Sequence, residues 1–150
     1  MSANIHIQRE DFDVSDEIDA LTAEQPLTGA VASFVGYVRG DGGLTAMTLE
    51  HYPNMTEQEI AHIVAEAQSR WPLTGTTIIH RIGRLAVGER IVLVAVASAH
   101  RGAAFAACEF LMDYLKTRAP FWKQEERGDK SEWVEAKTSD DAAAERWRKS

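Results

Sequence analysis

Residues Arg90 to Lys123 read RIVLVAVASAHRGAAFAACEFLMDYLKTRAPFWK and carry the strongest structural signals of the chain. The first part of this stretch is almost continuous in Val, Leu, Ile and Ala, which predicts a strand buried on both faces. From Ala103 onward, apolar side chains recur at helical spacing, so the second part predicts an amphipathic helix. Pro120 ends this helix about a turn after Lys116, because the residue before a proline is disfavoured in helical geometry. A further strand, APFWKQEE, follows.

The segments before this stretch predict strands and helices in irregular alternation. A short alternating strand near the start precedes a helix over residues 15–23, with Ser15 as its cap. The runs GAVASFVGYVRG and LTAMTLEHY flank the turn-like GDGG, so we expect a hairpin with Arg39 at its tip. A helix capped by Thr56 comes next. It leads into a strand, TTIIHRIGRL, which a turn around Gly88 separates from the buried strand.

The segments after this stretch complete a small mixed domain. WVEAK predicts one more strand, and the charged, alanine-rich segment from Ser139 to Trp147 predicts a final helix. At 150 residues and 45% hydrophobic residues, the chain is long enough for one core but not for two comfortable ones. We therefore expect a single domain over residues 1–150 of class α+β, with a mixed or antiparallel sheet and flanking helices.

Charge and composition argue against several classes of protein. The 16 basic and 23 acidic side chains give a net charge of -7, which is unfavourable for binding nucleic acid or an anionic membrane. No apolar run approaches the ~20 residues that span a bilayer, and the N-terminus has no signal-like apolar segment. The single cysteine, Cys108, excludes an intrachain disulfide and fits a reducing cytosol. We expect a cytoplasmic protein whose cationic site is local.

Metal and cysteine chemistry receive little support. The histidines lack metal-ligand spacing, and GDGG lacks the strand-to-helix context of a phosphate loop, so we expect no metal and no cofactor. Cys108 lies on the apolar stripe of its helix, which favours a core side chain over a nucleophile. His51 follows Glu50 and is compatible with acid–base chemistry, although a structural hydrogen bond is the more common role at a strand end.

Two pairs of basic residues are the candidate functional residues. His100 and Arg101 stand where a strand ends and a helix begins, a place that attracts anions. The alternative is that His100 caps the helix and Arg101 is an ordinary solvated cation. Lys116 and Lys123 flank the helix stop beside two aromatic residues, and burial with like charge is how lysines become nucleophiles or acid–base groups. The alternative is that Lys116 complements the helix C-terminus and Lys123 faces solvent.

A set of motifs in fixed order carries a resemblance to a known family. The motifs are GAVASFVGYVR, MTLEHYPNMTE, HRIGRL, SAHR, MDYLKTRAPFWK and WVEA. The chain resembles, over roughly residues 29–147, the MoaE family of molybdopterin synthase catalytic (large) subunits. The resemblance implies an α/β hammerhead fold and a sulfurtransferase that converts cyclic pyranopterin monophosphate to molybdopterin. It also implies a small sulfur-carrier subunit with a C-terminal Gly-Gly thiocarboxylate, and a homodimer of large subunits within a heterotetramer.

The resemblance also assigns roles to individual residues. Lys116 falls on the lysine at the thiocarboxylate end and the acid–base step, and Lys123 on the lysine that holds substrate or intermediate charge. Arg39, His100 and Arg101 fall on the positions that recognise phosphate and pterin.

Further positions are implied more weakly. Phe34 and Met112 would line the pocket or tail channel, although both are equally good core residues. Glu125 stands two places after the second lysine, and Lys137 stands where some relatives have arginine. Asn54 replaces a common glycine, which we expect to matter little because asparagine tolerates a left-handed conformation. The rival hypothesis is a non-catalytic binding module that docks an acidic or phosphorylated partner.

Overall fold

The computed structural model describes residues 2–134 and 138–148. In chain order the elements are β1 (Ser2–Gln8), α1 (Val14–Thr22), β2 (Ala30–Tyr37), β3 (Ala46–His51), α2 (Met55–Arg70), β4 (Leu73–Arg81), β5 (Gly83–Ala86), β6 (Arg90–Ser98), α3 (Arg101–Thr117), β7 (Phe121–Arg127), β8 (Lys130–Val134) and α4 (Thr138–Glu145). They form two four-stranded sheets, which we call the first sheet (β1-β4-β6-β2) and the second sheet (β5-β3-β7-β8).

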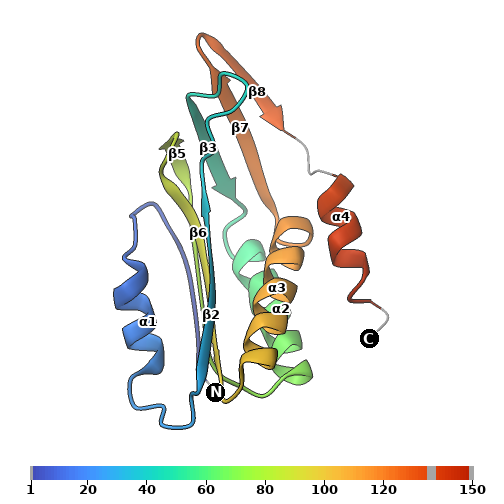
Figure 1. The fold of residues 1–150 in the computed structure, drawn as a ribbon. Coiled ribbons are helices and arrows are strands. Elements are labelled where there is room, and N and C mark those ends of the chain that lie inside the picture. Colours follow the sequence, from blue (N-terminus) through green and yellow to red (C-terminus); the bar gives the residue numbers. More distant parts are fainter. Residues whose placement is uncertain (1, 135–137, 149–150) are drawn as a thin grey trace.

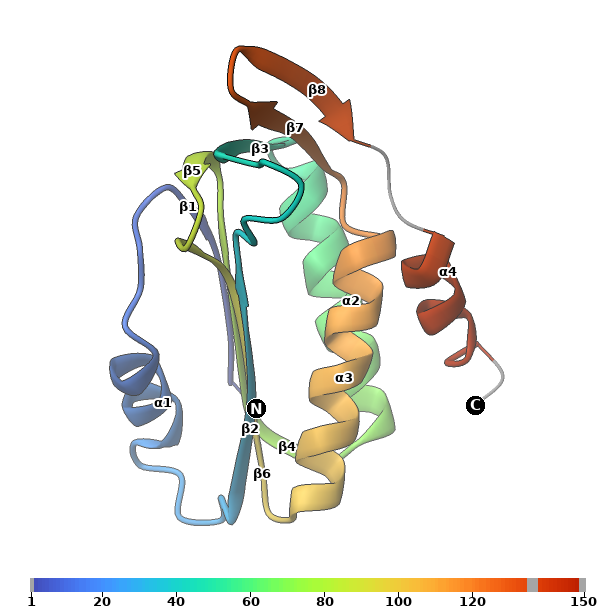
Figure 2. The same ribbon diagram turned by 45° about the horizontal axis from the view of Figure 1, so that its top comes forward.

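The first sheet carries the main core between helices on both of its faces. Strands β1 and β4 run parallel, and the other pairs are antiparallel, so the predicted mixed α+β architecture is confirmed. Helix α1 covers one face, and α2 and α3 cover the other (Figures 1 and 2). Along β6, Val94 and Val96 face α2 and α3, whereas Leu93 and Ala95 face α1. The prediction of a strand buried on both faces is therefore confirmed.

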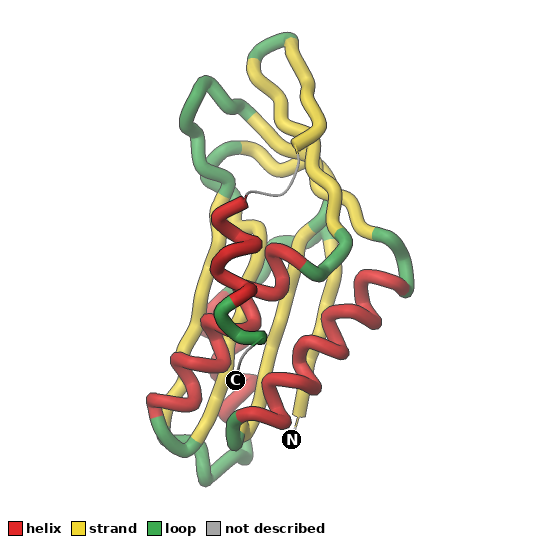
Figure 3. The backbone as a smooth tube through the Cα atoms, turned by 90° about the vertical axis from the view of Figure 1, so that its right-hand side faces the viewer, coloured by secondary structure: helices red, strands yellow, loops and turns green. Residues whose placement is uncertain are grey.

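The second sheet lies beyond one end of the first, with the β7–β8 hairpin farthest out (Figures 1 and 3). All its strand pairs are antiparallel. The predicted hairpin between the runs before and after GDGG is wrong, because β2 pairs with β6 whereas β3 pairs with β5 and β7. The glycine-rich loop between them carries the chain from one sheet to the other. Strand propensity and turn residues do not distinguish this crossing from a hairpin.

The predicted strand TTIIHRIGRL also crosses between the sheets. It divides into β4 and β5, with the break at Ile82 followed by Gly83, whose φ is 88°. The left-handed backbone favours glycine at this position, whereas the nearest atom to a Cβ there would be a guanidinium nitrogen of Arg9 at 2.5 Å, the end of a flexible side chain that can move aside. The crossing places the end of β4 beside the second sheet, where the candidate site lies.

Two helix starts differ from the predictions by one or two residues. Asp13, not Ser15, caps α1, because its carboxylate accepts a hydrogen bond from the Asp16 amide at 3.0 Å. Asn54, not Thr56, occupies the N-cap of α2, with a φ of 71°, which agrees with the expectation that asparagine tolerates a left-handed turn there. The buried Thr56 hydroxyl instead donates to the Pro120 carbonyl at 2.8 Å.

The C-terminal elements follow the predictions closely. Helix α3 ends at Thr117, which leaves Lys116 in its last turn, and β7 begins directly after Pro120. The predicted strand WVEAK corresponds to the end of β8, and its last three residues lie outside the described part of the chain. Helix α4 confirms the predicted last helix, and Trp147 after it packs against the rings of Trp71 and Phe110.

Cys108 lies on the buried face of α3. It is 7% exposed, and burial raises the pKa of its thiol to about 11. The preference for a core side chain over a nucleophile is confirmed. In the described residues, no helix has both the length and the apolar character needed to cross a membrane.

Candidate active site

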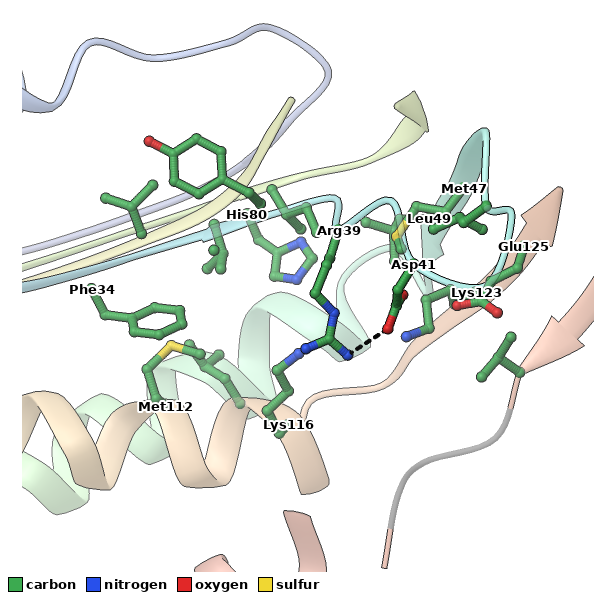
Figure 4. A pocket seen from close by; sticks show the side chains of 18 of the residues that line it. Phe34, Arg39, Asp41, Met47, Leu49, His80, Met112, Lys116, Lys123 and Glu125 are labelled. Atoms are coloured by element: carbon green, nitrogen blue, oxygen red, sulfur yellow. Dashed lines mark ion pairs between the residues drawn. The ribbon is translucent and has the colours of Figure 1, made fainter. Parts of the chain in front are cut away.

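A cavity of about 590 Å³ lies where the two sheets meet, at the C-terminal end of α3 (Figure 4). Its wall draws on β2 and the loop after it, on β3, β4, α3 and the β7–β8 hairpin. The described residues that line it with charged side chains are Arg39, Asp41, Lys116, Lys123, Glu125 and Arg127. Four of these six are cations, so an acidic protein concentrates positive charge at one place.

Lys116 and Lys123 reach this cavity from opposite sides of the helix stop. Lys116 is in the last turn of α3, whereas Lys123 is the third residue of β7. Because successive strand side chains point to opposite faces, Lys123 faces the cavity together with Glu125 and Arg127. Trp122 is absent from the lining and is 39% exposed. The turn at Pro120 thus brings Lys116 of α3 and Lys123 of β7 to one pocket.

Arg39 extends over the same cavity from the loop between β2 and β3. Figure 4 shows the side chains of Arg39 and Lys116 both directed into the cavity, with an ion pair from Arg39 to Asp41. That ion pair is 3.2 Å long and well exposed to solvent. Lys116 forms no ion pair with any carboxylate in residues 2–134 or 138–148. Its charge is thus uncompensated by a described partner, as suits a group that binds an anion.

His80 on β4 completes the inner wall of the cavity. Its ring stacks on Phe121 with centroids 3.8 Å apart, and Nδ1 lies 2.9 Å from the Arg81 carbonyl oxygen. Burial lowers the pKa of His80 to about 4, and the nearby charges of Lys116 and His51 act in the same direction. The imidazole is therefore neutral at pH 7. With Nδ1 donating to the carbonyl, Nε2 is left as a hydrogen-bond acceptor.

The sequence reasoning missed both His80 and Arg127. A signal for His80 was available, because it is a polar residue inside the otherwise buried run of β4. Arg127 could have been found from the alternation along β7, which puts it on the same face as Lys123. Glu125, which the resemblance implied, does line the cavity, and it pairs with Arg127 at 3.0 Å.

Phe34 and Met112 both line the cavity, as the resemblance implied. Phe34 is 41% exposed and so is not a core residue, whereas Met112 packs partly against the main core. Both also border a second hollow of about 690 Å³ between β2 and α3, which includes the exposed ring of Phe105. Lys137 lies outside the described residues.

The structure does not bring His100 and Arg101 to the pocket of their own chain. They stand at the N-terminal end of α3, and Lys116 is near its other end, about 23 Å away along the helix at ~1.5 Å per residue. Both are exposed. His100 occupies the N-cap position, as the alternative predicted, although its side chain makes no capping hydrogen bond.

His51 has a structural setting at the end of β3. Its Nε2 lies 3.7 Å from the Glu57 carboxylate, and its side chain is 17% exposed. In the described residues, no group of three or more His, Cys, Asp or Glu side chains is placed to hold a metal ion.

Comparisons of this chain with a family model, with known sequences and with solved structures point to the same family. The family model described as MoaE protein matches residues 7–118. A molybdopterin synthase catalytic subunit from Mesorhizobium japonicum is 58% identical, over 100% of this chain and 96% of its own length. The solved MoaE protein from Burkholderia ambifaria, of molybdopterin biosynthesis, has a TM-score of 0.86 and 53% identity, with 97% of this chain and 98% of that one covered.

A more distant solved structure shows the same fold. It is a protein–protein complex of subunits 1 and 2 of the molybdopterin-converting factor from Helicobacter pylori, with a TM-score of 0.75 and 20% identity, over 87% of this chain and 90% of that one.

Proposed function

The chain belongs to the MoaE protein family, and we propose that it is the catalytic subunit of a molybdopterin synthase. Its substrate is cyclic pyranopterin monophosphate, and its sulfur donor is the C-terminal Gly-Gly thiocarboxylate of a small sulfur-carrier subunit. The relatives' description as a catalytic subunit and the two-subunit complex of the distant relative support such a partner. The reducing environment that a thiocarboxylate requires supports a cytoplasmic location, as does the single free cysteine.

The observation that carries this proposal is the meeting of Arg39, Lys116 and Lys123 in one cavity of an acidic protein. The substrate contains a phosphate diester, and the donor ends in an anionic thiocarboxylate. Two anions approach each other only where cations offset their repulsion, and charge-assisted hydrogen bonds from lysine and arginine do this best. The three cations reach the cavity from a loop, a helix and a strand, so the fold itself assembles the site.

The chemistry assigns a separate task to each lysine. The thiocarboxylate sulfur forms a bond to a substrate carbon as the carbon–oxygen bond at that carbon breaks, and the displaced oxygen leaves as water or stays on the opened phosphate. Water then adds to the acyl carbon and the acyl carbon–sulfur bond breaks, so the sulfur remains on the substrate, the tail ends as a carboxylate and the protons of the water are released. We assign Lys116 to the thiocarboxylate end, where an ammonium stabilises negative charge on the acyl oxygen and can exchange a proton. Lys123, on the facing strand, holds the charge of the substrate or of the intermediate.

The positions of His100 and Arg101 lead to a proposal about assembly. They lie too far from the pocket of their own chain, yet the resemblance places them among the residues that recognise substrate. We propose that, in a homodimer, they reach the pocket of the neighbouring protomer. β2 is an edge strand beside α3, and the exposed Phe34 and Phe105 lie along it. An antiparallel association across this face would place the N-terminus of one α3 near the C-terminus of the other.

A single-turnover experiment tests the proposed function. The wild type and its Lys116→Ala variant are mixed with thiocarboxylated small subunit and cyclic pyranopterin monophosphate, and product and subunit binding are measured separately. We expect product from the wild type and a rate lower by about 10²–10³-fold for the variant, with subunit binding retained. Lys130→Ala is the matched control, because Lys130 is exposed on β8 and does not line the cavity.

The rival hypothesis, a module that only docks an acidic or phosphorylated partner, predicts another result. Such a module would bind the small subunit but yield no product with either protein. It would lose affinity, rather than turnover, when Lys116 is replaced.

A further inference from the structure

Arg39 owes its place over the cavity to the loop that carries it. Its ion pair is with Asp41, a residue of the same loop, so that contact does not fasten Arg39 to the body of the protein. The loop is glycine-rich, and Gly42 and Gly43 have positive φ values of 62° and 79°. Backbone hydrogen bonds hold the two ends of this loop at Val38 and Thr45, so a contact at its glycine-rich middle decides how steadily Arg39 stays over the cavity.

Arg127 supplies a contact of this kind from the second sheet. Its Nε donates a 2.9 Å hydrogen bond to the Gly42 carbonyl, at the middle of the loop. Its Nη1 donates a 3.0 Å hydrogen bond to the Glu125 carboxylate, which fixes the guanidinium on the cavity-facing side of β7. One planar group therefore joins the loop of Arg39 to the strand of Lys123. Lysine cannot reproduce this geometry, because its ammonium lacks the rigid fork.

We propose that Arg127 is a positioning residue that fastens the loop of Arg39 over the cavity and thereby sets the affinity for the anionic substrate. Arg127 is itself 39% exposed and borders the cavity. The competing explanation is that it only adds positive charge there. The two explanations differ because the loop contact requires the shape of arginine, whereas the charge effect requires only a cation. The kinetic consequence rests on the proposed function, but the effect on the loop does not.

The test compares Arg127→Gln and Arg127→Lys with the wild type. Arg84→Gln is the matched control, since Arg84 pairs at 3.0 Å with Glu126, the neighbour of Arg127 on β7, but does not line the cavity. Backbone hydrogen exchange over residues 39–45 reports on the loop in each full-length protein. The assembled synthase, with thiocarboxylated small subunit, reports kcat and KM for cyclic pyranopterin monophosphate.

We expect faster exchange over residues 39–45 in both Arg127 variants and none of this change in Arg84→Gln. We also expect both variants to raise KM by about 10-fold, the effect of losing one charge-assisted hydrogen bond, while kcat stays within about 3-fold. In an Arg39→Ala background, Arg127→Gln should raise KM no further, because Arg127 acts through Arg39.

Three results would overturn the inference. One is a rate of hydrogen exchange over residues 39–45 in Arg127→Gln that equals that of the wild type. Another is a wild-type KM in Arg127→Lys, which would assign the effect to charge. The third is a further rise in KM when Arg127→Gln is added to Arg39→Ala, as large as the rise that Arg127→Gln causes alone. If the wild type itself forms no product, the proposed function fails, while the exchange measurement still decides whether Arg127 fastens the loop.

Discussion

His80 of the first sheet stacks on Phe121 of the second, with ring centroids 3.8 Å apart and planes inclined by 16°. The contact joins two sheets that share no strand pairing. It lies beside the cavity, within reach of the charge on Lys116. The low pKa of His80 makes the contact between the two sheets sensitive to pH.

Lowering the pH should destabilise the protein through His80. In the unfolded chain the imidazole takes up a proton near its ordinary pKa of 6.5, whereas burial lowers the pKa in the folded protein to about 4. Unfolding therefore becomes more favourable as pH falls from 6.5 toward 4, by up to about 3 kcal/mol from this group. Urea unfolding of the wild type and His80→Gln across this pH range measures the change in the free energy of unfolding. The control is His62→Gln, because His62 is exposed. Equal pH slopes in all three proteins would contradict the prediction.

Replacing Lys123 should remove turnover without unfolding the protein. Lys123→Ala deletes one of the pocket cations, and a lost electrostatic stabiliser typically lowers kcat by about 10²–10³-fold. The melting temperature should stay within a few degrees of the wild type, because the side chain is only half-buried. Single-turnover rates and thermal unfolding, with Lys130→Ala alongside, provide the measurement. A loss of activity no larger than that of Lys130→Ala would remove Lys123 from the chemistry.

The hydroxyl of Thr56 should matter for stability although it does not line the cavity. It is fully buried, accepts from the Tyr52 amide at 3.0 Å and donates to the Pro120 carbonyl at 2.8 Å. Thr56→Val leaves both backbone groups without this partner, so the free energy of unfolding should fall by about 1–3 kcal/mol. Thr56→Ser keeps the hydroxyl and should retain most of the free energy of unfolding that Thr56→Val loses.

A suitable control for that substitution is Thr117→Val, whose hydroxyl bonds to a carbonyl of its own helix. Chemical unfolding that shows equal losses for Thr56→Val and Thr117→Val would argue against a link between α2 and the helix stop.

Complementation tests the assembly proposed for His100 and Arg101. Lys116→Ala and Arg101→Ala are prepared separately, mixed under subunit exchange, and assayed together. If Arg101 serves the neighbouring protomer, each mixed dimer contains one pocket with both side chains intact, so activity returns to a fraction of the wild-type level. If Arg101 served its own chain, every pocket in the mixture would lack one group and no activity would return.

The sequence predicted best those elements whose signals are local. The apolar run of β6, the stripe of α3 and the stop at Pro120 depend on neighbours in the chain, and the structure agrees with them. The course of the chain after Arg39 was predicted wrongly, because strand pairing depends on which edges are free in the folded protein. No local rule states that β2 joins β6 while β3 joins another sheet.

The candidate site shows the same division. Lys116 and Lys123 could be placed near one turn from the sequence alone, since a helix end and a strand start fix them both. For His80 and Arg127 the sequence offered only their positions along β4 and β7, because their contacts with Phe121 and Gly42 join residues that are distant in the chain. His100 and Arg101 matched a motif, but a motif carries no information about the distance along α3 that separates them from the cavity.

The alternation along β7 also limits how the chain can change in length. Lys123, Glu125 and Arg127 share the cavity face, and the residues between them face away. Inserting or deleting one residue within the strand would exchange the two faces for the residues that follow the change, and so turn the cavity-facing charges beyond it outward. Single-residue length changes are therefore tolerable only at the tip of the hairpin, where Gly128 takes a positive φ. In descendants of this chain, we expect insertions to accumulate at that tip and the strand itself to keep its length.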